Sequence, residues 1–202
     1  VGQATDILVT DVYPFNRNMP ITSVGDGMRS AISAVDNVKP VWSVLQTFRL
    51  PSSGWHYLPT IGEVCNMAYQ ALLAGSKGMA YYSINDPGWS LKNSELWPGL
   101  IQFKDELALM GGLVTKGSKI HESVSGLVQW GVWQEGSEQY AVAINTTGEE
   151  QDVVIPLDQT GNKVELLYGA ETAQFIKWDA ELTAHLEPWQ TLVYHMTPIL
   201  NG

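Results

Sequence analysis

Residues 59–84 read PTIGEVCNMAYQALLAGSKGMAYYSI and contain a helix signal followed by a strand signal. Thr60, with Glu63 three positions later, matches the sequence pattern of a capping box at a helix N-terminus. Apolar residues then recur every three or four positions, which predicts an amphipathic helix over residues 60–74. The apolar run at 78–84, which follows a glycine that ends the helix, predicts a buried strand. The stretch therefore predicts one helix-to-strand step of a parallel sheet.

Two more strand signals precede this stretch. DILVTDV at 6–12 and VWSVLQTF at 41–48 are short apolar runs, and residues 23–35 between them have the apolar spacing of a second amphipathic helix. Strands that alternate with helices are typical of a parallel β/α layer. Because three parallel strands cannot close a barrel, we expect residues 1–93 to be the last part of a larger β/α sheet.

The hydrophobic pattern changes after a third predicted helix at 96–110, which the Gly111-Gly112 pair is expected to end. From there the apolar residues alternate with a period of two, which is typical of an antiparallel β-sandwich. The predicted strands include the runs at 140–144, 153–157, 164–168, 182–186 and 192–194. We therefore expect an α/β domain at 1–110 and an all-β domain at 111–202.

The composition excludes several classes of protein. Lys and Arg number 11 against 21 Asp and Glu, which gives a formal charge of −10 and a pI near 4.7 and works against a surface that follows nucleic-acid phosphates. No window approaches the roughly 18 consecutive apolar residues of a membrane-spanning helix. The single cysteine, Cys65, and the four scattered histidines have no metal-ligand spacing. We expect no nucleic-acid partner, no membrane span, no metal and no cofactor.

Polar and aromatic residues follow each predicted strand of the first half. In β/α barrels the active site is built at the carboxyl ends of the strands. Sugar sites pair carboxylate or amide groups, which bind hydroxyls, with flat aromatic rings, which cover the C–H faces of the sugar. The strand ends offer both kinds of group, and we expect a carbohydrate site that contains Asp11, Tyr13, Gln46, Tyr82, Asp86 and Trp89.

Three segments resemble the C-terminal part of a bacterial glycoside hydrolase of the β-galactosidase-like or a related clan. They are KPVWSVLQTF at 39–48, PTIGEVCNMAYQALLAGSKGMAYYS at 59–83 and LEPWQTLVYHM at 186–196. The resemblance covers nearly the whole chain. It implies an α/β plus all-β fold, with the last three β/α units of a TIM-type barrel followed by an antiparallel β-sandwich. It also implies an enzyme that hydrolyses O-glycosidic bonds in oligo- or polysaccharides.

Such enzymes use two carboxyl groups, one as acid and one as nucleophile or base. In the large retaining clan the acid follows the fourth strand and the nucleophile ends the seventh, but here the corresponding strand ends in Leu45-Gln46-Thr47, without a carboxylate. The resemblance leaves Asp11 and Glu63 as the catalytic candidates, with other catalytic carboxyl groups expected upstream of this chain. Alternatively, Asp11 binds loop amides and Glu63 caps its helix.

The other candidates are assigned to substrate binding: Tyr13, Gln46, Tyr82, Asp86 and Trp89. Asp86 has an alternative role, since Asn-Asp-Pro-Gly is also typical of a turn. Besides the carbohydrate substrate, the expected partner is the missing N-terminal part of the barrel or another copy of the chain, because three strands leave open sheet edges.

Two other functions stay open. In one, the second half would bind polysaccharide without hydrolysis. In the other, the chain would be a structural accessory to a catalytic partner. A binding platform would be built from tryptophans, namely Trp130, Trp133, Trp178 and Trp189. The chain starts at Val1 without an initiator Met, so we expect a processed or truncated piece of a protein. The sequence does not predict its cellular compartment, and secretion or a periplasmic location are both open.

Overall fold

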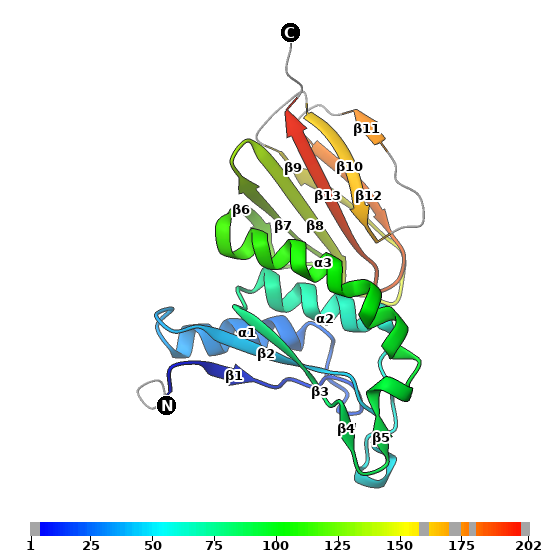
Figure 1. Cartoon of the computed structure of the whole chain (residues 1–202). Coiled ribbons are helices and arrows are strands. Elements are labelled where there is room, and N and C mark those ends of the chain that lie inside the picture. The colour runs from blue at the N-terminus through cyan, green and yellow to red at the C-terminus, as the bar shows by residue number, and fades with distance from the viewer. Residues whose placement is uncertain (1–4, 158–161, 170–174, 178–180, 199–202) are drawn as a thin grey trace. The chain divides into compact units, whose positions relative to one another are not determined.

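The computed structural model describes residues 5–157, 162–169, 175–177 and 181–198 (Figure 1). The chain divides into two compact units, Val1–Leu107 and Ala108–Gly202. Parallel strands and helices make up the first unit, and antiparallel strands make up most of the second. The protein is therefore a mixed α/β chain. None of the helices in its described part is long and apolar enough to cross a membrane.

The first unit contains a three-stranded parallel sheet in the order β1-β2-β3. The strands are β1 (Leu8–Thr10), β2 (Val41–Gln46) and β3 (Gly78–Tyr82), and the connecting helices are α1 (Ser23–Ala34) and α2 (Ile61–Leu73). All three predicted strands and the two helices predicted between them are present, although each is shorter than predicted. Short apolar runs for the strands and a period of about 3.6 for the helices were sufficient to find them, because each signal is local.

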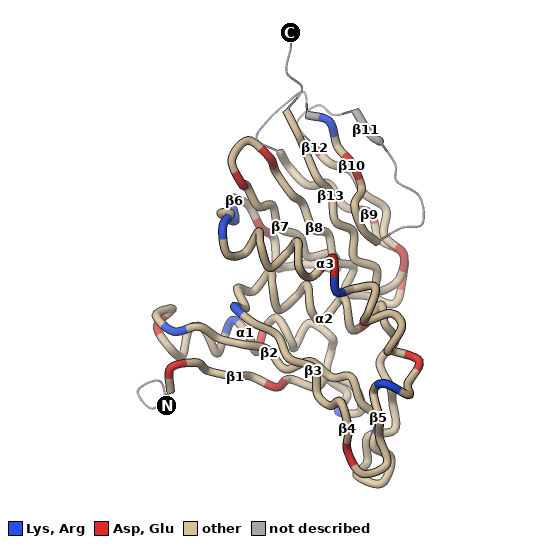
Figure 2. The backbone as a smooth tube through the Cα atoms, in the orientation of Figure 1, with Lys and Arg blue, Asp and Glu red and all other residues tan. Residues whose placement is uncertain are grey.

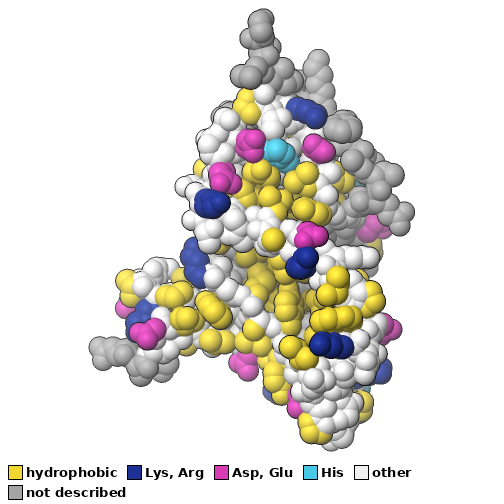
Figure 3. All heavy atoms as spheres, in the orientation of Figure 1, with side chains coloured by type: hydrophobic (Ala, Val, Ile, Leu, Met, Phe, Trp, Pro, Cys, Tyr) yellow, Lys and Arg dark blue, Asp and Glu magenta, His cyan; other side chains and the backbone are white. Residues whose placement is uncertain are grey.

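The two faces of this sheet differ in exposure. On the helix side, Val41 is buried and packs with Met28. On the other side Val9, Trp42 and Tyr82 are 52%, 39% and 42% exposed. β2 and β3 contain no charged residue (Figure 2), and apolar side chains lie over the strands (Figure 3). The sheet therefore presents an apolar face to solvent and has β1 and β3 as edge strands.

Short elements shape the loops that follow the strands. They are η1 (Pro51–Ser53), the antiparallel pair β4 (Asn85–Asp86) and β5 (Trp89–Ser90), and η2 (Leu91–Asn93). Gly88 turns the chain between β4 and β5 with a φ of 82°, a conformation that favours glycine. This hairpin holds two of the predicted site residues.

The helix α3 (Leu96–Lys116) is longer than predicted, and the prediction that Gly111-Gly112 ends it is wrong. A glycine in a helix interior costs about 1 kcal/mol relative to alanine, which weakens a helix without ending it. Met110 and Leu113, on either side of the pair, are both buried and offset this cost. The boundary between the two compact units falls inside α3, after Leu107.

The second unit has a six-stranded sheet in the order β11-β10-β13-β8-β7-β6 and a two-stranded sheet of β12 and β9. The strands are β6 (Ser118–Ser123), β7 (Val128–Glu135), β8 (Glu138–Asn145), β9 (Gln151–Pro156), β10 (Asn162–Tyr168), β11 (Phe175–Lys177), β12 (Glu181–Leu186) and β13 (Thr191–Pro198). One buried cluster joins residues of both sheets, for example Val132 and Ala141 with Ile155 and Leu182.

Candidate functional site

The carboxyl ends of the parallel strands surround a pocket of about 670 Å³. We call it the aromatic pocket, and its lining includes Asp11, Tyr13, Phe48, Trp55 and Tyr82. Asp11 and Tyr13 follow β1, Phe48 follows β2, and Tyr82 is the last residue of β3. The structure therefore brings together three of the predicted site residues, because parallel strands end at the same edge of the sheet.

The four rings of this pocket contact one another. Tyr13 and Tyr82 stack with centroids 6.1 Å apart, while Phe48 lies 5.3 Å from Tyr13 and 5.1 Å from Trp55 in edge-to-face geometry. The guanidinium of Arg17 lies 4.9 Å from the centre of a Trp55 ring. Such contacts hold the rings in fixed orientations, so they form a preformed apolar surface.

Asp11 is the acidic residue of this pocket. Its side chain is exposed, and it makes no hydrogen bond or ion pair with another residue in the described part of the chain. Burial raises the pKa of Tyr13 to about 12, and the neighbouring Asp11 charge and Tyr82 contribute to the increase. The alternative in which Asp11 binds loop amides is not what the structure has, so its carboxylate is available to a ligand.

Gln46 is fully buried, unlike the other predicted substrate-binding residues. It lies opposite Tyr82 in the register of β2 and β3. Neither atom of its side-chain amide has a hydrogen-bond partner among the described residues. Because a buried amide without partners is costly, this position is incomplete as it stands. A sugar would reach Gln46 only if the residues around it moved.

Glu63 is a helix cap and does not line the aromatic pocket. Its N–H donates to Thr60 Oγ1 (3.2 Å), and its carboxylate accepts from the N–H of Thr60 (2.7 Å). Both carboxylate oxygens also accept from the hydroxyl of Tyr57 at 2.9 Å. Burial, followed by this hydrogen bond to Glu63, raises the pKa of Tyr57 to about 12. The capping alternative that the sequence offered describes this geometry.

Asp86 and Trp89 lie in a second pocket of about 660 Å³, which we call the polar pocket. Its lining includes Arg49, Asp86, Trp89, Asn93, Ser94 and Glu95. The indole N–H of Trp89 donates to the carbonyl of Ser83 (3.0 Å), and the Ser83 hydroxyl donates to Asp86 (2.9 Å). The six residues expected at the strand ends thus divide between two pockets and one buried position.

Phe48 and Trp55 also line the aromatic pocket and Arg17 lies over Trp55, although none of the three is among the site residues assigned from the sequence. Phe48 and Trp55 belong to a stretch at 48–57 that contains four aromatic or histidine side chains, which was the available signal. Their approach to Tyr13 depends on how the loop after β2 folds back, and no local pattern encodes that path. Leu50 and Trp55 close this loop with a pair of backbone hydrogen bonds.

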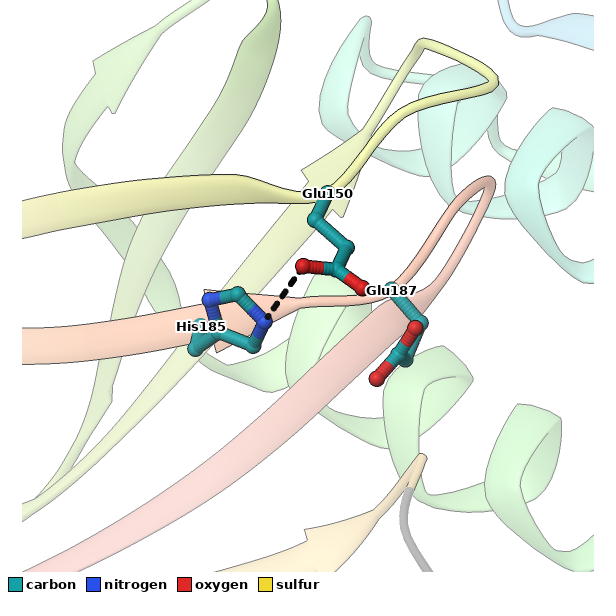
Figure 4. A group of neighbouring side chains, drawn as sticks. All are labelled: Glu150, His185 and Glu187. Atoms are coloured by element: carbon teal, nitrogen blue, oxygen red, sulfur yellow. Dashed lines mark ion pairs between the residues drawn. The ribbon is translucent and has the colours of Figure 1, made fainter.

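Three exposed side chains of the second unit, Glu150, His185 and Glu187, place potential metal-ligand atoms within 4.8 Å of one another (Figure 4). His185 Nε2 lies 3.7 Å from Glu150, and its Nδ1 lies 2.8 Å from Asp152. The hydrogen bond with Asp152 is the main cause that raises the pKa of His185. Linear spacing did not reveal this group because the pairing of β9 with β12 creates it. Exposed acidic groups often gather without a metal, and we assign no role to this one.

Two of the four tryptophans named for the alternative binding platform pack in or against the core of the second unit. Trp133 is buried, with 3% of its surface exposed, and Trp130 packs against the core of the second unit. Trp189 is half-buried, and Trp178 lies outside the described residues.

In the first unit, burial raises the pKa of the Cys65 thiol to about 12, so this cysteine is protonated at neutral pH.

The fold resembles that of solved glycoside hydrolases. A GH27 β-L-arabinopyranosidase from Geobacillus stearothermophilus matches 98% of this chain with 47% of its own, at a TM-score of 0.67 and 12% identity. A GH30 endoxylanase from Clostridium papyrosolvens matches 98% of this chain with 50% of its own, at a TM-score of 0.55 and 12% identity. An α-amylase from Anoxybacillus matches 96% of this chain with 48% of its own, at a TM-score of 0.59 and 14% identity.

No protein-family model and no curated protein matches the chain. The chain spans about half the length of the solved structures that it matches. At 12% to 14% identity these matches show the fold alone. The resemblance that the sequence indicated is confirmed at this level: the chain has the fold of about half of a glycoside hydrolase.

Proposed function

We propose that this chain is part of a glycoside hydrolase that acts on the O-glycosidic bonds of oligo- or polysaccharides. Residues 1–110 would form the last three β/α units of a TIM-type barrel, and residues 111–202 an accessory β-sandwich. The parallel order β1-β2-β3, the helices that connect these strands, and the buried cluster shared by two antiparallel sheets all support this assignment. The matches to glycoside hydrolases add support at the level of fold.

The observation that carries the proposal is the unpaired carboxylate of Asp11 beside four aromatic rings at the carboxyl ends of parallel strands. A glycosidase needs a carboxyl group that faces the glycosidic bond, and it needs a surface on which a sugar ring stacks. Asp11 would supply the first as acid or nucleophile, and Tyr13 and Tyr82 would contribute to the second.

The reaction needs a second carboxyl group. Glu63 and Asp86 are the other carboxylates proposed from the sequence, and both already accept hydrogen bonds from this chain, Glu63 from Thr60 and Tyr57 and Asp86 from Ser83. We therefore propose that Glu63 is structural and that the second catalytic carboxyl group comes from further β/α units. These units would belong to a longer parent chain or to another copy of this one, and they would cover the exposed face of the sheet.

Asp11→Asn tests the role of the carboxylate. We would assay a panel of aryl arabinosides, xylosides, glucosides and galactosides on the 202-residue chain and on any longer protein that contains it. If Asp11 is the general acid, kcat/KM should fall about 10²- to 10⁴-fold for substrates with poor leaving groups. It should fall much less for dinitrophenyl glycosides, whose leaving group needs no proton. A nucleophile would show losses with both kinds of substrate.

Asp36→Asn is the matched control. Asp36 has a φ of 52°, and asparagine tolerates this left-handed conformation, so the same change of charge is made without backbone strain. Equal activities of the parent, Asp11→Asn and Asp36→Asn proteins on every hydrolysed substrate would exclude Asp11 from the chemistry.

A second candidate function is carbohydrate binding without hydrolysis. It is favoured by the absence of a second carboxylate among the residues that line the aromatic pocket. This function predicts that sugars bind to the chain with an affinity that depends on Tyr13 and Tyr82. It also predicts that the 202-residue chain, and every longer protein that contains it, fails to hydrolyse the glycosides of the panel.

A further inference from the structure

We propose that the polar pocket is a second sugar subsite, so that the site as a whole takes an oligosaccharide rather than a single sugar. This inference rests on the proposed function and adds to it the length of the ligand. Both pockets fall within the volume range of small-molecule sites, about 300–1,000 Å³.

Consecutive residues of one chain segment line the two pockets, so the pockets are neighbours. Phe48 and Leu50 line the aromatic pocket, and Arg49 between them lines the polar pocket. Tyr82 lines the aromatic pocket, and the carboxylate of Asp86 in the polar pocket is the main cause that raises the pKa of Tyr82. A ligand that crosses from Tyr82 to Asp86 would therefore contact both pockets without leaving the surface of the first unit.

The polar pocket has its own aromatic ring. Trp89 is held by the hydrogen bond from its indole N–H to the carbonyl of Ser83, and its backbone pairs with Asp86 in the β4–β5 hairpin. Because both its backbone and its ring nitrogen are held, the ring is pre-oriented. A fixed ring costs little conformational entropy when it binds a ligand.

The polar groups around Trp89 suit a neutral ligand with many hydroxyls. Arg49 makes no ion pair or hydrogen bond in the described part of the chain, so its N–H groups are free to donate to a ligand. Asp86 and Glu95 supply acceptors, and Asn93 supplies both a donor and an acceptor. Two carboxylates against one guanidinium disfavour a phosphate or another anion, and the polar lining disfavours a purely apolar ligand. A second sugar unit meets all of these conditions.

Calorimetric titration of the 202-residue chain tests this inference. The probes are the methyl glycosides of xylose, arabinose and glucose, and the tetrasaccharides xylotetraose, arabinotetraose and maltotetraose. We expect one sugar series in which the tetrasaccharide binds at least about tenfold more tightly than the methyl glycoside. Arg49→Ala and Trp89→Ala should each remove roughly tenfold of the affinity for the tetrasaccharide and leave that for the methyl glycoside unchanged.

Lys92→Ala is the matched control for Arg49→Ala, because Lys92 is an exposed cation of the adjacent η2 that does not line the pocket. Thermal melts of all variants show whether each is folded. Because Arg49 is exposed, we expect Arg49→Ala to fold like the parent chain. Equal affinity for short and long sugars, with no effect of Arg49→Ala, would overturn the second subsite and leave the proposed function intact. Failure of every sugar to bind, both to the 202-residue chain and to any longer protein that contains it, would overturn both.

Discussion

The rings of Tyr13 and Tyr82 stack with centroids 6.1 Å apart and an angle of 28° between their planes. Tyr13 follows β1 and Tyr82 ends β3, the two outer strands of the sheet, so the contact spans the end of the central strand β2. Phe48, which follows β2, lies 5.3 Å from each of the two rings. Each of the three strands thus contributes, at or just after its carboxyl end, one ring to the same cluster beside Asp11.

Tyrosine ionisation should weaken the fold at alkaline pH. Burial raises the pKa of Tyr13 and of Tyr194 to about 12, above the usual value of 10. Between pH 10 and 12 the folded chain therefore keeps protons that the unfolded chain has lost, so the free energy of unfolding should fall as pH rises through this window. Urea unfolding on either side of the window measures the fall, and phenolate absorbance follows the titration. The idea fails if these tyrosines titrate near pH 10 in the folded protein.

The exposed apolar face of the parallel sheet should make the isolated chain self-associate. Val9 is 52% exposed on this face, and Val38, in a loop, is 78% exposed. Val9→Lys places a charge on an edge strand and should weaken association, whereas Val38→Lys should not, because only the former interrupts the apolar face. Sedimentation across a range of concentrations measures this. A monomeric parent chain with a cooperative melt would count strongly against the need for a partner.

The capping box should contribute to stability. Thr60→Ala removes the oxygen that accepts from the Glu63 N–H and should lower the free energy of unfolding by about 1 kcal/mol. Glu63→Ala should cost at least as much, because it removes the buried carboxylate that accepts from both the Thr60 N–H and the Tyr57 hydroxyl. Urea melts measure both changes. If Glu63→Gln abolishes hydrolysis while the melting behaviour is unchanged, Glu63 is catalytic and the structural assignment is wrong.

Two glycines of the second unit should differ in their tolerance of alanine. Gly169 and Gly126 both have positive φ, 104° and 97°, so both substitutions impose backbone strain of roughly 1 kcal/mol. A Cβ at Gly169 would lie 2.0 Å from the carbonyl oxygen of Thr191, whereas a Cβ at Gly126 would meet nothing within 4 Å. Gly169→Ala should therefore destabilise by a further 2 kcal/mol or so, because backbone cannot move aside cheaply. Equal melting temperatures of the two variants would contradict this account.

The sequence alone was sufficient to predict the parallel strands of the first unit and the helices that connect them. The strands near residues 8, 41 and 78, the helices between them, and the capping box of Thr60 and Glu63 all depend on residues within about four positions of one another. It was also sufficient to place Asp11, Tyr13 and Tyr82 at one edge of a sheet, since parallel strands connected by helices must end on the same side.

Tertiary structure decided what depends on distant residues. α3 continues through Gly111-Gly112 because burial of its neighbours outweighs the local helix-ending signal. Gln46 is buried rather than exposed at a strand end, and Asp86 and Trp89 lie in a pocket of their own because the β4–β5 hairpin carries them there. Strand register, loop path and burial are set by contacts between residues that are far apart in the chain. A local pattern names the groups available for a site, and only packing decides which of them meet.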